Sequence, residues 1–325
     1  RRESALENVV PLENLKDLPG KLLADGYNLK RIGFELDVLP AGLYLYYQKL
    51  FNPAEILDAS LLIRTVRAVK SPYELELLRN AAKMNHTLFS CVREFLREGI
   101  TEVEFAAKLE EVYRREGHQG YVRMRGFNQE IVYGHLMSGW NLATPSTSPG
   151  PTGGSGLNPS FPQGAGLKVI GRDEPVMVDY VGVCDGYMVD QARIFCIGKL
   201  SEKLEYAHGV ALEIQELLKN EGKTGVVCGE LYDMAVQVAG DRGLKDNFMG
   251  YPEPVPFVGH GVGIELDELP VLARGVKTPL QEGMVVALEP KFVFPEGAAG
   301  IENTFVVTKD GLETLTVFDE DIIYL

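Results

Sequence analysis

One stretch, Val176 to Phe195 (VMVDYVGVCDGYMVDQARIF), constrains the fold most, because it carries two carboxylates inside what otherwise reads as a buried β-hairpin. Asp185-Gly186 is a two-residue signal for the turn that joins antiparallel strands. The register set by this turn places Asp179 and Asp190 on one face, as diagonal neighbours roughly 7–8 Å apart at Cα. Two ionised carboxylates in an apolar sheet repel each other and lose hydration, so the hairpin favours a divalent metal between them.

Two other interpretations of the hairpin stay open at this point. Asp190 could form an ordinary ion pair with Arg193. Alternatively, a register shifted by one residue would turn either Asp out to solvent. The hairpin alone does not choose among the three, and the decision depends on the rest of the chain.

The composition is that of a globular protein with more than one domain. The chain has 325 residues, which exceeds the usual size of a single domain. Its formal net charge of −14 argues against nucleic acid or a membrane surface as a partner. The four cysteines show no CxxC spacing and no apolar run approaches the roughly 18 residues of a membrane span, so we expect free thiols and a cytoplasmic location.

Residues 1–70 are predicted to form a first, smaller unit. Helical spacing appears at Leu15–Leu23 and Pro40–Leu50, and strand-like runs appear at Arg31–Glu35 and Ala59–Arg67. No combination of residues in this unit indicates catalysis.

The second unit opens at Ser71-Pro72-Tyr73-Glu74, where the signals for a helix start coincide. That helix is expected to end near Gly99, and a second capping box at Thr101–Glu104 starts another that ends at Gly117. Two further helices are predicted at Ser201–Lys219 and Gly229–Asp241. Two helices followed by strands therefore occur twice.

Residues 133–166 are dense in Pro, Gly, Ser and Thr and are predicted to form a long loop. Long loops in compact domains often cover or line a binding site. His135 and Trp140, the only Trp, are therefore candidates for substrate contact. A surface insertion with one anchoring aromatic explains the segment equally well.

The second half of the candidate site lies beyond residue 257. His260 stands between glycines in FVGHGVGIELDELP, Glu289 lies in MVVALEP and Glu302 in AGIENTFVV. Unpaired carboxylates in such apolar runs are costly. Together with Asp179 and Asp190 they make four carboxylates and one imidazole, a set that two divalent cations would neutralise.

The order of these five residues resembles the pita-bread metallohydrolases, which include methionine aminopeptidase, Xaa-Pro aminopeptidase, prolidase and creatinase. The resemblance covers nearly the whole chain. It implies an α+β fold, with a pita-bread catalytic domain over residues 71–325. Residues 1–70 resemble part of the smaller α/β N-terminal domain of the prolidase, aminopeptidase P and creatinase branch.

The resemblance also implies the role of each residue. Asp179 would bind one metal, Asp190 and Glu302 would bridge both, and His260 and Glu289 would complete the other. In the peptidase relatives two metal ions activate water for attack on the scissile carbonyl, and Glu289 corresponds to the residue that moves the proton. Carboxylate-rich ligation with one His suits Mn best, with Fe, Co or Zn as alternatives.

Two histidine positions depart from the family pattern. Where the peptidases carry a His seven residues after the metal-binding His, this chain has Asp267, which could grip a substrate amine or donate a proton if it were protonated. Where a family His follows Pro in an N-x-x-x-P-H segment, this chain has Ser146. His135 is the nearest residue that could stand in for a missing imidazole. The Arg that often precedes the final Glu is also absent, since Ile301 is there.

The leading expectation is a dinuclear metal-dependent hydrolase of small peptides or amides, nearest to Xaa-Pro dipeptidase or Xaa-Pro aminopeptidase. A non-peptidase enzyme on the same scaffold, such as a creatinase-like C–N hydrolase or a lyase, is the first alternative. A non-catalytic binding protein is the second. The resemblance further implies a homodimer.

Overall fold

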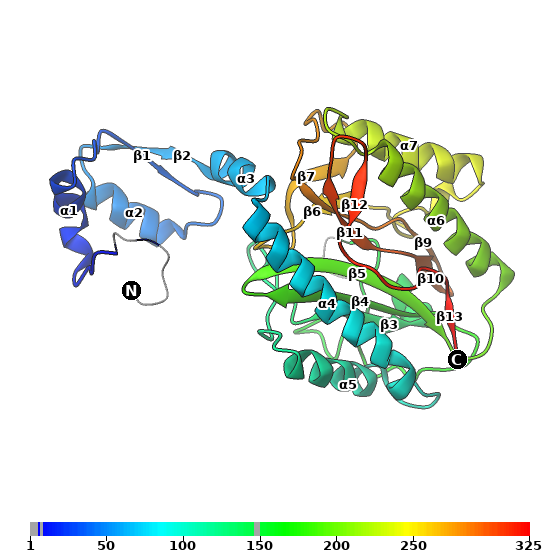
Figure 1. The fold of residues 1–325 in the computed structure, drawn as a ribbon. Coiled ribbons are helices and arrows are strands. Elements are labelled where there is room, and N and C mark those ends of the chain that lie inside the picture. Colours follow the sequence, from blue (N-terminus) through cyan, green and yellow to red (C-terminus); the bar gives the residue numbers. More distant parts are fainter. Residues whose placement is uncertain (1–5, 7–8, 146–149) are drawn as a thin grey trace. The chain divides into compact units, whose positions relative to one another are not determined.

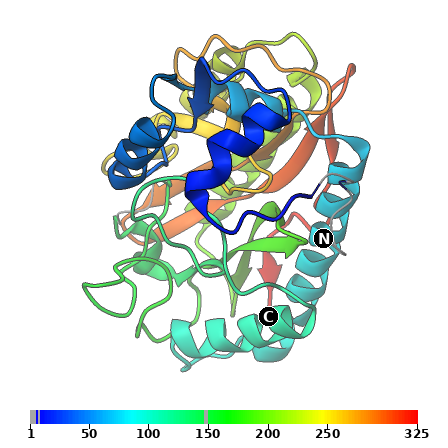
Figure 2. The same ribbon diagram turned by 90° about the vertical axis from the view of Figure 1, so that its left-hand side faces the viewer.

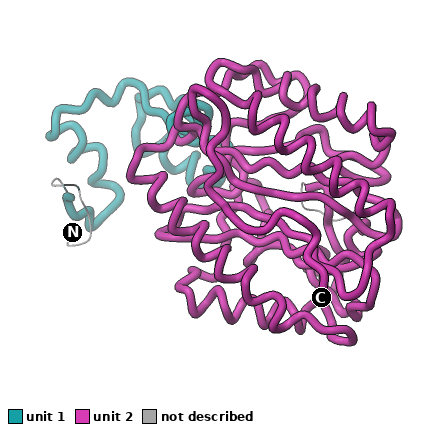
Figure 3. The backbone as a smooth tube through the Cα atoms, turned by 45° about the vertical axis from the view of Figure 1, so that its right-hand side comes forward, with its two compact units in different colours: residues 1–66 teal, residues 67–325 magenta. Residues whose placement is uncertain are grey.

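The computed structural model describes residues 6, 9–145 and 150–325, and the chain divides into two compact units, residues 1–66 and 67–325 (Figure 3). In the first unit, η1 (Leu15–Asp17) leads into α1 (Leu18–Ala24). Strands β1 (Arg31–Phe34) and β2 (Glu55–Asp58) pair in parallel, and α2 (Ala41–Leu50) connects them. A parallel pair needs such a crossover connection.

The strand predicted at Ala59–Arg67 is wrong, because this segment forms the helix α3 (Ser60–Ala68). Its β-branched residues favour a strand locally. However, the carboxylate of Asp58 accepts a hydrogen bond from the Ser60 backbone N–H at 2.9 Å, which satisfies a donor of the first turn. The Thr65 hydroxyl also donates to the Leu61 carbonyl one turn back. These local bonds favour the helix.

Two sheets and a hairpin form the centre of the second unit. The first sheet has the order β13-β5-β4-β3. The second sheet has the order β12-β11-β8-β6-β7, and β9 pairs with β10. The bounds are β3 Gly134–Ser138, β4 Val176–Cys184, β5 Tyr187–Cys196, β6 Phe257–Gly261, β7 Glu268–Ala273, β8 Val285–Leu288, β9 Lys291–Phe294, β10 Gly297–Gly300, β11 Asn303–Val307, β12 Leu312–Thr314 and β13 Ile323–Tyr324.

Four long helices pack against these strands. They are α4 (Pro72–Phe95), α5 (Glu102–Arg115), α6 (Glu202–Glu221) and α7 (Cys228–Asp241). The short helix η2 (Gly139–Ala143) lies between β3 and β4, and η3 (Lys245–Asn247) lies between α7 and β6. Both predicted capping boxes are confirmed, at Ser71/Glu74 and Thr101/Glu104. In Figures 1 and 2, α5 and α7 lie at opposite ends of this unit with the strands between them. The predicted order, two helices followed by strands, occurs twice.

The predicted register of the opening hairpin is confirmed. Asp185 and Gly186 have φ values of 48° and 83°, and β4 pairs with β5 so that Val181 faces Asp190. Positive φ at both turn residues matches the right-handed twist of the strands. The shifted register, which would turn one carboxylate to solvent, is therefore wrong.

The alternative ion pair between Asp190 and Arg193 is also wrong. The five N–H groups of the Arg193 guanidinium donate to five uncharged oxygens, which belong to the backbone carbonyls of Ala192, Glu302, Phe318 and Asp319 and to the Asn303 side chain. Only 1% of Arg193 is exposed. The Arg193 guanidinium therefore holds backbone carbonyl groups in place and does not pair with Asp190.

The segment 133–166 is only partly the predicted loop, because it begins with β3. This strand pairs antiparallel with β4, and His135 lies opposite Asp179. A strand that pairs with a segment far along the chain cannot be recognised from local composition. For this reason the sequence predicts a loop at the residues of β3. Glu102, buried at the start of α5, holds the segment after β3 in place by accepting hydrogen bonds from Ser138, Asn141 and Gly166.

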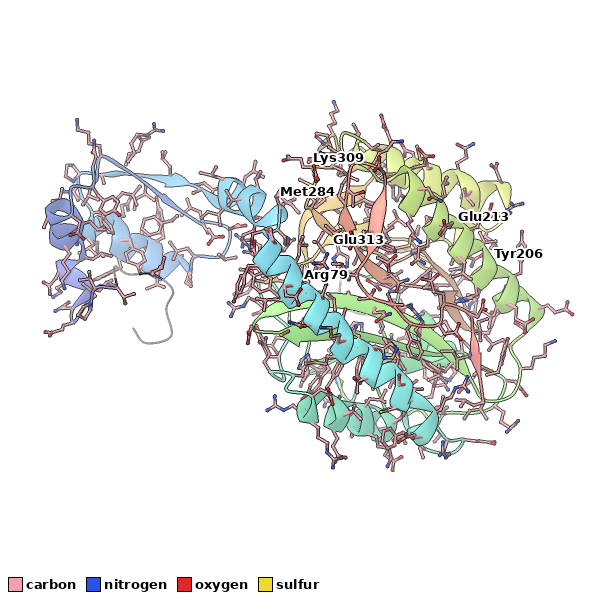
Figure 4. The ribbon with its side chains drawn as sticks, viewed as in Figure 1. Arg79, Tyr206, Glu213, Met284, Lys309 and Glu313 are labelled. Carbon is pink, nitrogen blue, oxygen red and sulfur yellow. The ribbon has the colours of Figure 1, made fainter. Side chains whose placement is uncertain are left out.

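Buried apolar faces, rather than surface charges, stabilise the unit. Leu78 and Leu88 of α4 are fully buried against the strands. By contrast, Arg79 of α4 and Glu313 of β12, both labelled in Figure 4, form an exposed 3.3 Å ion pair. Exposed pairs contribute between zero and about 1 kcal/mol.

All four cysteines are free, and the described helices include none with the length and apolarity to cross a bilayer.

Candidate active site

The five predicted metal ligands come together from five places in the two sheets. Asp179 lies on β4, Asp190 on β5 and His260 on β6, while Glu289 directly follows β8 and Glu302 directly precedes β11. All five line one cavity of about 60 Å³. An isolated bridge between Ala192 and Glu302 joins the two sheets at this point. The prediction that these residues converge is confirmed.

The glycines around His260 are required by close backbone approach. A Cβ on Gly259 would lie 2.4 Å from the Ala287 carbonyl oxygen, and one on Gly261 would lie 2.2 Å from the Leu269 carbonyl oxygen. β6 therefore fits between β7 and β8 only with glycine on both sides of the imidazole. The sequence Gly-His-Gly thus fixes the position of His260 in the sheet.

Hydrogen bonding fixes which nitrogen of His260 is available to a ligand. Its Nδ1 lies 3.1 Å from the carbonyl oxygens of Leu266 and Gly261, so Nδ1 carries the proton and donates it. The lone pair of a neutral imidazole is then on Nε2. That atom faces Glu289 Oε1 at 3.7 Å and Glu302 Oε1 at 3.8 Å.

Asp190, His260 and Glu302 fit a divalent cation. Each offers one donor atom, and the three atoms lie within 4.8 Å of one another. Glu302 Oε1 is buried and has no hydrogen-bond partner among the described residues. A buried carboxylate oxygen left unpaired beside an imidazole lone pair is expected where a cation binds. These three residues would therefore hold a divalent cation.

A further charged residue, Lys291, lies at the centre of the site, and sequence reasoning missed it. Its Nζ donates to Glu302 Oε2 at 2.6 Å and to Asp179 Oδ2 and Glu289 Oε2 at 2.9 Å each. Only 1% of Lys291 is exposed. The predicted charge balance set four carboxylates against two divalent ions and did not include the positive charge of Lys291. Its position two residues after Glu289, at the start of the apolar run KFVF, was the available signal.

Burial and mutual repulsion set the electrostatics of the acids. Burial raises the pKa of Glu289 to about 7, and burial together with Glu302 and Asp179 raises the pKa of Asp190 well above its usual range. Burial likewise raises the pKa of Asp179. Although burial opposes it, the positive charge of Lys291 lowers the pKa of Glu302. The site without a metal therefore holds more acid than it can keep ionised, which favours cation binding.

The predicted substrate residues have different outcomes. His135 and Asp267 line the same cavity as the ligands. The buried Nε2 of His135 has no hydrogen-bond partner in the described part of the chain, and Asp267 Oδ1 lies 3.4 Å from His260 Nδ1. Trp140, which is 53% exposed on η2, is absent from the described residues that line this cavity, so its substrate role stays a prediction. Ser146 lies outside the described residues.

Comparison with known proteins gives two family matches. Metallopeptidase family M24 matches residues 76–309, and the creatinase/prolidase N-terminal domain matches residues 1–69. The first match covers well over half of the chain.

Individual relatives agree with these matches. A putative dipeptidase of Bacillus subtilis is 31% identical over 84% of this chain and 67% of its own length. An Xaa-Pro dipeptidase of Pyrococcus horikoshii is 27% identical over 98% of this chain and 81% of its own length. The solved structure of an Xaa-Pro dipeptidase from Bacillus anthracis superimposes with a TM-score of 0.79 at 27% identity, covering 95% of this chain and 78% of that one.

These comparisons confirm the predicted fold class, an α+β pita-bread catalytic domain preceded by a smaller creatinase-like domain. They also agree with the convergence of acids and one imidazole in the catalytic unit. The chain therefore belongs to metallopeptidase family M24 and is a hydrolase of the metallopeptidase class.

Proposed function

We propose that this protein hydrolyses the peptide bond before proline in small Xaa-Pro substrates, with a divalent metal held by Asp190, His260 and Glu302. The observation that carries the proposal is the donor set itself, in which the His260 Nε2 lone pair and the unpaired Glu302 Oε1 face one cavity. The relatives named as Xaa-Pro dipeptidases support the choice of substrate class.

The residues around the metal-donor set each have a separate role in hydrolysis. A divalent ion held by Asp190, His260 and Glu302 would supply Lewis acidity near neutral pH. Glu289, whose pKa burial raises to about 7, accepts a proton from the attacking water and returns it to the leaving amine. His135 offers its unpaired Nε2 to the developing oxyanion, in place of an imidazole that the family pattern has elsewhere. Asp267, at the cavity wall, accepts hydrogen bonds from the substrate amine.

Several finer predictions stay part of this proposal. Manganese is the expected ion, with Fe, Co or Zn as alternatives, because the donors are mostly carboxylates. The homodimer and the cytoplasmic location stay predictions. The sequence predicts two ions, but Lys291 already contacts three of the four carboxylates, which argues against that number.

Removing the metal is expected to abolish hydrolysis of Xaa-Pro dipeptides, and adding Mn²⁺ is expected to restore it. Release of proline from Ala-Pro and Leu-Pro should be measured before chelation, after chelation and dialysis, and after addition of Mn²⁺. Ala-Ala is the matched control and should be cleaved slowly or not at all. Unchanged turnover after complete removal of metal would contradict metal dependence. Failure to cleave any Xaa-Pro substrate would contradict the proposed peptidase activity and favour a non-peptidase reaction.

Exchanging Asp267 for His tests the substrate-side difference from the family pattern. If Asp267 merely occupies the position of the family imidazole, Asp267→His should keep or raise the activity on Xaa-Pro dipeptides, because imidazole can donate to an oxyanion. We expect the opposite, a rise in KM of about tenfold, because a charged hydrogen bond to the substrate amine is worth roughly 1.5–3 kcal/mol. An unchanged KM would remove Asp267 from the proposed amine site. Asp310→His, on an exposed turn, is the matched control.

A further inference from the structure

We infer that Lys291 takes the place of a second metal ion, so that this centre binds one divalent cation per chain. The inference rests on the proposed function only in requiring a metal at Asp190, His260 and Glu302. It concerns the number of ions and not the substrate.

The Lys291 ammonium is fully satisfied where it lies. An ammonium has three N–H donors and no acceptor. Its three contacts, at 2.6, 2.9 and 2.9 Å, are all carboxylate oxygens, from Glu302, Asp179 and Glu289. A buried cation with this many charged partners is held firmly, because moving it would leave both the ammonium and the acids unpaired in a dry site.

Two carboxylates are shared between the ammonium and the donor set. Glu289 and Glu302 each direct Oε2 to Lys291, while Oε1 of each faces His260 Nε2 at 3.7 and 3.8 Å. They therefore bridge two positions for positive charge, one of which a protein side chain already occupies. Asp179, predicted to be a metal ligand, contacts the occupied position.

The backbone around Lys291 also accommodates its side chain. Gly300 pairs with Lys291 across the β9–β10 hairpin. A Cβ on Gly300 would lie 2.7 Å from the Lys291 Cα and 2.8 Å from its Cγ. Any larger residue at position 300 would press on the stem of the lysine, so the hairpin is shaped to place the ammonium among the acids.

The positive charge of Lys291 also bears on a second ion. When all four carboxylates are ionised, as cation binding favours, they carry four negative charges, of which Lys291 neutralises one and a divalent ion two. One divalent ion then leaves a net charge of −1 and two leave +1, so the sums are equal in size. A second ion would, however, have to displace the ammonium from its three carboxylate partners. Separating a buried ammonium from its charged partners is unfavourable, and this cost favours a single ion.

The test is the metal stoichiometry of the full chain, measured with Mn²⁺ by isothermal titration and by elemental analysis after gel filtration. Wild-type protein should bind one ion per chain, and Lys291→Gly should bind two, because the vacated position exposes Asp179 to solvent ions. Lys168→Gly removes another largely buried lysine, paired with Glu174, and should still bind one. Two ions in wild type, or one in Lys291→Gly with an unchanged melting temperature, would overturn the inference.

A second variant keeps the inference falsifiable if Lys291→Gly fails to fold. Asp179→Asn preserves size and retains an oxygen for the ammonium. If Asp179 serves Lys291 rather than a metal, this variant should keep one ion and change its Kd by less than about threefold. A drop in stoichiometry in Asp179→Asn would overturn the inference and leave the proposed hydrolysis standing. Wild-type protein that binds no ion would overturn both.

Discussion

Replacing Glu302 with Gln is expected to lower kcat/KM on Xaa-Pro dipeptides by at least about a thousandfold, which corresponds to about 4 kcal/mol of transition-state stabilisation. Glu302 both contacts Lys291 and belongs to the Asp190–His260–Glu302 donor set. Gln keeps the shape of the side chain but removes its charge. The substitution therefore lowers the affinity of the site for the metal ion. It also leaves the Lys291 ammonium with two charged partners instead of three.

The measurement is kcat/KM together with the Mn²⁺ content of the purified variant. Glu313→Gln is the matched control, because Glu313 is an exposed glutamate on β12 that forms a surface ion pair with Arg79 (Figure 4). That control should change kcat/KM by less than about twofold. Normal turnover by Glu302→Gln would contradict the assignment of the donor set.

Replacing Arg193 with Lys is expected to lower the free energy of unfolding by roughly 3 kcal/mol, although the charge is kept. Each of the five guanidinium N–H groups has an acceptor, at distances from 2.6 to 3.2 Å. An ammonium has only three donors, so at least two buried oxygens would lose the hydrogen bond that Arg193 donates. One of the acceptors is the backbone carbonyl of Glu302, which links this network to the site.

Urea unfolding, followed by circular dichroism, measures the loss. Arg79→Lys is the control, since Arg79 makes an exposed ion pair, and it should change stability by no more than about 0.5 kcal/mol. Because Arg193 holds the backbone of Glu302, we also expect Arg193→Lys to weaken Mn²⁺ binding. A stable variant with unchanged metal affinity would show that the five hydrogen bonds are dispensable.

Features with a strong local signal could be predicted from the sequence. The Asp185-Gly186 turn fixes the hairpin register, and the capping boxes fix the starts of α4 and α5, because each depends on residues a few positions apart. The four acids and the imidazole could be found because unpaired charges in apolar runs require a common explanation. Their order along the chain then indicated the family.

Features that depend on distant partners could not be predicted in the same way. β3 exists because His135 and its neighbours pair with β4, and that pairing is not encoded in the Gly- and Pro-rich composition around it. The apolar run KFVF, which begins with Lys291, is compatible with burial, but it does not show which side chains surround the lysine. Only the fold shows that three acids from separate places in the chain surround it. The sequence does not show which side chain neutralises these three acids, whereas the fold shows that it is Lys291.

A crystal structure of the full chain soaked in Mn²⁺, with anomalous scattering recorded at the manganese edge, tests the account most directly. We predict one anomalous peak among Asp190, His260 and Glu302, with the Lys291 ammonium still bonded to Asp179. Two peaks, with Lys291 turned away from the acids, would contradict the single-ion centre. No peak in the cavity at saturating Mn²⁺ would contradict the metal site itself.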